Sequence, residues 1–182
     1  MGPNDADGLT TAHGLPGDTD LDTATPDPTF DAAALIFDFT TDTGDLFFDY
    51  VFASEEYNEF IESGVTDAFA FFVDGTNIAL VPGTTDPVNI NTVNCGNPFA
   101  PPSGGSNCSL FNNNGLQDGG PFFDIQYDGL TDVFTSAILG LGAGIHTTKL
   151  VVGDAGDEVL DSAVFLEAGS FSSTEPGPGS VP

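Results

Sequence analysis

Apolar residues along the chain gather in short runs that are separated by turn-forming residues. The two richest runs, Leu46–Ala53 and Ala68–Val73, have the length of strands and are crowded with aromatic and β-branched side chains. In Leu46–Ala53 both sets of alternating positions are mostly apolar, so a strand here would be buried on both faces. Such a strand belongs inside a structure of two packed layers.

Further strand signals begin at Phe30 and continue almost to the end of the chain. The turn TDTGD at Thr41–Asp45 separates the first of them from the rich run that follows. Later runs of the same character are Asn77–Val81, Val88–Val93, Phe122–Tyr127, Asp132–Leu139, His146–Val152 and Ser162–Ala168. About eight to ten short strands with irregular turns predict an all-β fold: an antiparallel two-sheet β-sandwich, jelly-roll-like, with long loops.

The composition divides the chain into one domain and two tails. The length of 182 residues suits a single domain with a sizeable core. Residues 1–28 are polar, acidic and rich in Gly, Pro and Thr, which predicts an N-terminal arm, and residues 29–171 are predicted to form the sandwich. Residues 94–120, rich in Asn, Gly, Pro and Ser, are expected to form an insertion or lid outside the core. Residues 172–182 are typical of a Pro/Gly/Ser linker.

Cys95 and Cys108 are the two cysteines of the chain, and both lie in the predicted insertion. No His is near them and their spacing is not CxxC, which argues against a zinc or redox motif. A disulfide that closes this loop is the preferred interpretation, and it would indicate an oxidising compartment. A pair of free thiols in a loop is the alternative.

The charge of the chain is strongly negative. Twenty-eight acidic residues stand against Lys149 alone, and the formal net charge is −27. Nucleic acids and anionic membrane surfaces are therefore poor partners, and no apolar run approaches the roughly 20 residues of a membrane-spanning helix. Two explanations of the acidity remain open at this point: local clusters that bind divalent cations, and a diffuse excess that keeps the surface soluble or adapted to salt.

Two acidic clusters stand out against this background. One lies between the two richest strands and consists of Glu55, Glu56, Glu59, Glu62 and Asp67. The other, DAGDEVLD, lies between the last two strands and contains Asp154, Asp157, Glu158 and Asp161. Like charges on rigid elements repel each other unless a cation or a proton intervenes.

Calcium is the cation that these clusters predict. Ca²⁺ takes six to eight oxygen ligands from carboxylates, carbonyls and water, and the small residues of DAGDEVLD let a loop bend its carboxylates inward. We expect Glu55 and Glu56 to converge with Asp154, Asp157 or Asp161 on one or more Ca²⁺ ions. The alternative is that these are solvated loop acids whose side chains cap turns.

Catalysis is the weaker interpretation of the same carboxylates. Glycosidases use two carboxyl groups about 5 to 9.5 Å apart, whereas adjacent residues such as Glu55 and Glu56 point to opposite faces of a strand. The chain has no Trp to line sugar subsites. Neither His13 nor His146 lies near a nucleophile motif, and GxSxG does not occur. We therefore predict that the protein is not an enzyme and has no catalytic residues.

Several segments resemble, in order, those of the choice-of-anchor L domain, a bacterial and archaeal surface module named for its varied C-terminal anchors. The most specific are SEEY within Phe48–Phe60 and the DAGD-to-DSAVF part of Val151–Phe171. The others are FDAAALIFDF (Phe30–Phe39), TDAFAFFVDG (Thr66–Gly75), NIALVPGTTDPVNINTVN (Asn77–Asn94) and QYDGLT (Gln126–Thr131). The resemblance implies secretion and display at the cell surface or in the extracellular matrix, a variable segment at 94–120, and a linker at 172–182 that leads to a C-terminal anchor of the PEP-CTERM or another type.

Together these observations predict a calcium-stabilised, non-catalytic module for cell adhesion or extracellular assembly, such as in a biofilm matrix. The expected partners are other surface or matrix components and further copies of the chain, in a homo-oligomer or filament. One alternative is a calcium-dependent carbohydrate-binding module that binds glycans through Asn and Asp side chains around Asn94–Asn114. A second alternative is a glycoside hydrolase that uses paired carboxylates.

Overall fold

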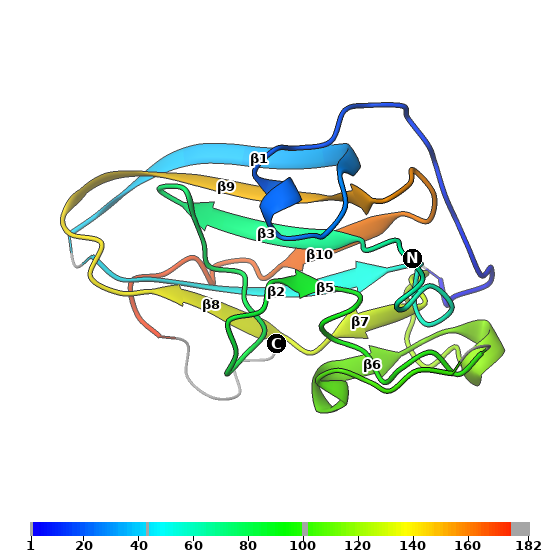
Figure 1. Cartoon of the computed structure of the whole chain (residues 1–182). Coiled ribbons are helices and arrows are strands. Elements are labelled where there is room, and N and C mark those ends of the chain that lie inside the picture. The colour runs from blue at the N-terminus through cyan, green and yellow to red at the C-terminus, as the bar shows by residue number, and fades with distance from the viewer. Residues whose placement is uncertain (1, 43, 100–101, 176–182) are drawn as a thin grey trace.

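The computed structural model describes residues 2–42, 44–99 and 102–175, and it is an antiparallel β-sandwich. Two five-stranded sheets pack against each other, as Figure 1 shows. The helices in the described part of the chain are 3₁₀ turns of three residues each. The two-sheet antiparallel β-sandwich predicted from the sequence is therefore confirmed. None of the described helices is long and apolar enough to cross a membrane.

The strands of each sheet come from distant parts of the chain. The first sheet runs in the order β1 (Thr29–Thr41), β9 (Gly144–Ala155), β3 (Ala68–Val73) and β4 (Thr76–Asn77), and β5 (Val88–Asn89) also pairs with β3. The second sheet runs in the order β10 (Ser162–Leu166), β2 (Leu46–Ser54), β7 (Gly129–Thr131) and β6 (Phe111–Asn113), and β8 (Phe134–Ile138) also pairs with β2. Consecutive strands such as β2 and β3 thus belong to different sheets.

The main core lies between the sheets and is built from the inward faces of β2 and β3. The ring centroids of Tyr50 and Phe69 are 4.8 Å apart, and those of Phe48 and Phe71 are 5.2 Å apart. All four side chains are buried. Alternation along each strand directs these aromatic rings toward the opposite sheet, so the phenylalanines of the two richest runs serve packing.

The N-terminal segment covers the outer face of the first sheet. Leu21 is fully buried there against Phe72 and Val151, in a second apolar cluster on the outer side of β3 and β9. The Nζ of Lys149 on β9 donates to the carboxylates of Asp18 and Asp20 at 2.6 and 2.7 Å. Burial on both faces explains why every residue of β3 is apolar.

Several strands differ from the sequence-based expectation. Phe122–Tyr127 contains no strand, and the carbonyls of Ile125 and Tyr127 accept instead from the side chain of Asn114. The strand predicted at Asn77–Val81 shrinks to β4, because the Asn77 side chain accepts from the backbone of Phe71 and Ala79 and turns the chain. The side chain of Asn89 similarly ends β5.

The predicted insertion, residues 94–120, belongs to the sandwich more closely than a lid would. It contributes β6, which pairs with β7, and the ring of Phe111 lies 4.7 Å from that of Tyr57. The disulfide expected between Cys95 and Cys108 is present. Most of the predicted linker, residues 172–182, lies outside the described residues, which end at Glu175.

Candidate cation site

Strand pairing brings the two acidic clusters to the same end of the sandwich. The turn 55–67 connects β2 to β3, and the loop 156–161 connects β9 to β10. Because β10 pairs with β2 and β9 pairs with β3, both connections cross between the sheets at one edge of the core. Backbone hydrogen bonds link them directly: the N–H of Glu55 donates to the carbonyl of Asp161 at 3.1 Å, and that of Thr66 to Ala155 at 2.8 Å.

Glu55 lies on one side of this end, beside the N-terminal segment. Its side chain is buried, and one carboxylate oxygen lies 3.4 Å from the backbone N–H of Gly8, which donates to it. Burial, together with the charges of Asp128 and Asp161, raises the pKa of Glu55 to about 8. Asp128, immediately before β7, is itself buried and accepts from the side chain of Asn4 at 2.5 Å. Burial raises the pKa of Asp128 to about 7.

Glu56 points to a different set of carboxylates. It is buried and accepts from the backbone N–H of Asp67 at 3.0 Å. Burial raises the pKa of Glu56 to about 8, and the nearby charges of Asp157 and Asp154 act in the same direction. Asp154, at the end of β9, is also buried, and burial together with the charge of Asp161 raises its pKa to about 7.

Asp67 is the most enclosed carboxylate of this set, with an exposed fraction of 0%. Its two oxygens accept from the backbone N–H of Ala155 at 3.3 Å and from the hydroxyl of Ser162 at 2.6 Å. Burial raises its pKa well above the usual range, and the charges of Glu56 and Asp154 add to the effect. Asp67 therefore holds the ends of β9 and β10 together and repels its acidic neighbours when ionised.

The remaining predicted ligands lie at the rim. Asp157 is exposed and accepts from the backbone of Val159, whereas Asp161 is half-buried and accepts from the backbone of Thr11 at 3.0 Å. The structure thus places all five predicted residues at one end of the sandwich. The charges of Asp154 and Asp157 raise the pKa of Glu56, whereas the charge of Asp161 acts on both Glu55 and Asp154.

No basic side chain in the described residues forms an ion pair with these carboxylates. Lys149 is occupied by Asp18 and Asp20 on the outer face of the first sheet. The Nδ1 of His146 lies 2.7 Å from a carboxylate oxygen of Asp74, in the turn after β3, and this contact raises the pKa of the imidazole. In the described part of the chain, no group of three or more Asp, Glu, His or Cys side chains is arranged to hold a metal ion.

A buried amide oxygen adds to the acidic end. The Nδ2 of Asn58 donates to Asn113 and to Asp118, both at 3.0 Å, and the oxygen of the same amide is buried with no hydrogen-bond partner. Next to it, burial and the charges of Asp7 and Asp118 raise the pKa of Glu59. The amide oxygen of Asn58 is therefore an uncommitted neutral ligand among carboxylates.

Three residues of this end were not among the ligands predicted from the sequence: Asp67, Asp128 and Asn58. Asp67 lies in the TDAFAFFVDG segment, immediately before β3, and Asp128 lies in QYDGLT. Each is an acidic residue that directly flanks a strand, and this pattern in the sequence could have identified it as a residue of the site. Asn58 carried none, because its role depends on the amides and carboxylates that fold around it.

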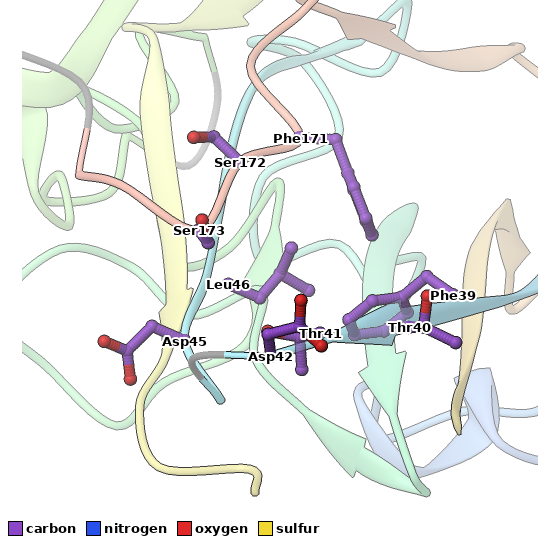
Figure 2. A pocket seen from close by; sticks show the side chains of 9 residues that line it. All are labelled: Phe39, Thr40, Thr41, Asp42, Asp45, Leu46, Phe171, Ser172 and Ser173. Carbon is purple, nitrogen blue, oxygen red and sulfur yellow. The ribbon is translucent and has the colours of Figure 1, made fainter. Parts of the chain in front are cut away.

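A pocket of about 350 Å³ lies at the opposite end of the sandwich, where β1 ends and β2 begins. Figure 2 shows Phe39 and Phe171 together on one side and Asp45 on the other. The remaining lining residues are Thr40, Thr41, Asp42, Leu46, Ser172 and Ser173. An apolar wall faced by hydroxyl and carboxylate groups suits a small amphipathic ligand.

The amides expected to bind glycans have other partners. The side chain of Asn94 donates to Ile90 and accepts from the backbone of Gly96, and that of Asn114 accepts from Phe122. Asn97 and Asn107 likewise donate to the backbone of Glu59 and Thr92. These side-chain hydrogen bonds stabilise the backbone conformation of the segment 94–120.

The two-sheet antiparallel sandwich, with its buried acidic end and its disulfide-closed loop, defines the chain as an all-β module. The chain belongs to the choice-of-anchor L domain family, whose model matches residues 1–172. Proteins of this family are surface-associated modules, secreted or anchored at the surface, and the family is not enzymatic. Neither a curated protein nor a solved structure matches the chain.

Proposed function

We propose that this protein is a calcium-stabilised surface module that serves adhesion or extracellular assembly, with its ion site at the acidic end. The observation that carries the proposal is the burial of Glu55, Glu56, Asp67, Asp128 and Asp154 together, without a basic partner among the described residues. Buried carboxylates are normally paired or bound to metal. At neutral pH the group must therefore hold protons or a cation.

A divalent cation would act here as a clamp between the two sheets. Glu56 and Asp67 lie on the turn from β2 to β3, whereas Asp154 and Asp157 lie at the end of β9 and beyond it. An ion held by both sets would fix the turn 55–67 to the loop 156–161. It would also neutralise the repulsion that raises the pKa of these carboxyl groups.

The ion would need a small movement of the rim. Asp157 is exposed and lies in a loop that follows Gly156, whose φ of +99° is in the region that favours glycine. Rotation of this loop would bring the Asp157 carboxylate toward Asp154 and Glu56. Because Ca²⁺ accepts irregular geometry and several waters, the buried carboxylates could stay in place.

Calorimetric titration of the chelated protein with Ca²⁺ tests this proposal. We expect binding to the wild type and at least about tenfold weaker binding to Glu56→Gln, which keeps the size of the side chain and removes its charge. Glu62→Gln is the matched control, since Glu62 lies in the same turn but is exposed, and its binding should equal that of the wild type. If the wild type shows neither heat nor a change in melting temperature with Ca²⁺, the calcium proposal is wrong.

Glycan binding is a second candidate, and the pocket between Phe39 and Asp45 favours it. Sugars bind through apolar contact with aromatic rings and hydrogen bonds to polar side chains, and this pocket offers both. On a glycan array we expect any signal of the wild type to be lost in Asp42→Ala, whose side chain is exposed at the pocket. A signal that survives in Asp42→Ala would place the glycan elsewhere.

A further inference from the structure

We propose that β1 is a docking edge at which a second copy of this chain adds its own β1, antiparallel and across a two-fold axis at Ile36. The two first sheets would then join into one continuous sheet. The inference deepens the assembly role proposed above and names the partner, but it does not depend on calcium.

The free edge of β1 is unusually long. The strand spans 13 residues, and β9 is its strand partner in the described part of the chain. The N-terminal segment covers only its first residues, through a bridge between Pro16 and Phe30 and a hydrogen bond from Ala32 to Pro16. From Ala33 onward no described strand lies along the outer side of β1 (Figure 1).

This edge is also apolar and exposed. Leu35 has an exposed fraction of 52%, Ile36 of 61% and Phe37 of 36%. A typical strand has about five to six residues, and exposed edges are commonly blunted by Lys, Pro, a bulge or a charge. Ala33–Phe37 contains none of these residues, and the irregularity in the β1–β9 register lies before it, between Phe30 and Ala33. The single Lys of the chain lies on β9 and is bound to Asp18 and Asp20.

The charge pattern of β1 is compatible with self-pairing. A two-fold axis at Ile36 places Ile36 opposite itself, Leu35 opposite Phe37 and Ala34 opposite Asp38. Thus neither Asp38 faces a carboxylate. Asp31 lies beyond the paired stretch, and its carboxylate accepts from the backbone of His13 and Leu15.

Copies of a chain with a net charge of −27 repel each other on approach. The neutral stretch of β1 is a place where two copies can approach with little repulsion and satisfy their unpaired backbone groups. A paired edge of about seven residues is shorter than a standard stable interface needs. The contact should therefore be weak in dilute solution, strengthen with ionic strength, and gain from the high local concentration of displayed modules.

Cysteine cross-linking tests the register directly. Since Cys95 and Cys108 are bonded to each other, a cysteine placed at Ile36 is the only free thiol of the described chain. We expect Ile36→Cys to form disulfide-linked dimers at least about tenfold faster than Val133→Cys, a control at a similarly exposed apolar site between β7 and β8. Equal rates for the two variants would overturn the proposal.

Sedimentation velocity of the unlinked protein supplies the second measurement. At high ionic strength we expect concentration-dependent dimers of the wild type and of Val133→Glu, and at least about tenfold weaker association of Ile36→Glu with an unchanged melting temperature. The result should be the same in calcium and in chelator. A wild type that stays monomeric at millimolar concentration refutes the edge contact while leaving calcium binding to be judged by calorimetry, and dimers that persist in Ile36→Glu would place the contact elsewhere.

Discussion

In the absence of divalent cations, the free energy of unfolding is expected to fall as the pH rises from about 5 to about 8. Burial raises the pKa of Glu55 and Glu56 from 4.5 to about 8, and that of Asp128 and Asp154 from 3.8 to about 7. In this interval the folded protein binds more protons than the unfolded chain does. Stability therefore decreases with pH, is fully present below the unfolded pKa values and is lost as the pH passes the folded ones.

The expected loss in the free energy of unfolding is at least about 3 kcal/mol. A total effective shift of roughly two pKa units, at 1.36 kcal/mol per unit, is enough to produce it. It should appear as a decrease of about 6–12 °C in melting temperature for a chain of this length. Calcium should cancel most of the decrease at pH 8, because the ion replaces the protons, and binding should release protons into the buffer. Thermal unfolding at several pH values, in chelator and in excess Ca²⁺, measures both effects.

Glu56→Gln gives this prediction its sharpest form. In chelator at pH 8 the variant should be more stable than the wild type, because a buried charge is removed while the amide oxygen can still accept from the backbone of Asp67. In excess calcium the order should reverse. Glu62→Gln, at an exposed site of the same turn, should match the wild type in both conditions. Stability that rises with pH in chelator would contradict the assignment of raised pKa values to this end.

The strands that sequence alone predicts best are those whose side chains meet the core on both faces. Ala68–Val73 coincides with β3, and Leu46–Ala53 with all but the last residue of β2. The strand predicted at Phe122–Tyr127 was wrong. The aromatic pattern of this segment is that of a strand, but the side-chain amide of Asn114 donates to its carbonyls instead. A hydrogen bond to a distant amide overrides local propensity and leaves no local signal.

The candidate site also depends on contacts between distant segments that the local sequence does not show. The charge of the turn 55–67 is evident in the sequence, but its position beside the loop 156–161 follows from the pairs Ser54–Ser162 and Ala68–Gly153. Register of this kind is set by the whole core rather than by the acidic residues. Glu55 and Glu56 follow β2 in the turn, and they face different partners, since Glu55 accepts from Gly8 and Glu56 accepts from Asp67. The sequence does not predict that the side chains of Asp67 and Asp128 are buried.

Charge is distributed unevenly over the molecule. Carboxylates without basic partners among the described residues gather at the end formed by the turn 55–67, whereas Lys149 draws Asp18 and Asp20 onto the outer face of the first sheet. The edge of β1 from Ala33 to Phe37 carries no charge. On an acidic chain a neutral strand edge opposes the approach of a second copy less than a charged surface does, which is the physical link between the acidity and the proposed assembly.

Replacement of Phe71 by Ala is expected to destabilise the fold by about 3–5 kcal/mol. The side chain of Phe71 is fully buried between the sheets, and its ring lies 5.2 Å from that of Phe48 at an angle of 76°. Truncation removes apolar burial, the edge-to-face contact and the packing of both sheets around the cavity that remains. The melting temperature should fall by roughly 6–20 °C, as measured by circular dichroism.

Phe122→Ala is the matched control, because Phe122 has an exposed fraction of 63%. Its free energy of unfolding should stay within about 0.5 kcal/mol of the wild type.

The affinity of Phe71→Ala for Ca²⁺ should equal that of the wild type at a temperature where the variant is still folded. Phe71 belongs to the main core, whereas the carboxylates lie at the end of the sandwich. A loss of calcium affinity without a loss of stability would show that the aromatic core shapes the ion site, and the separation of packing from chemistry in this fold would then be wrong.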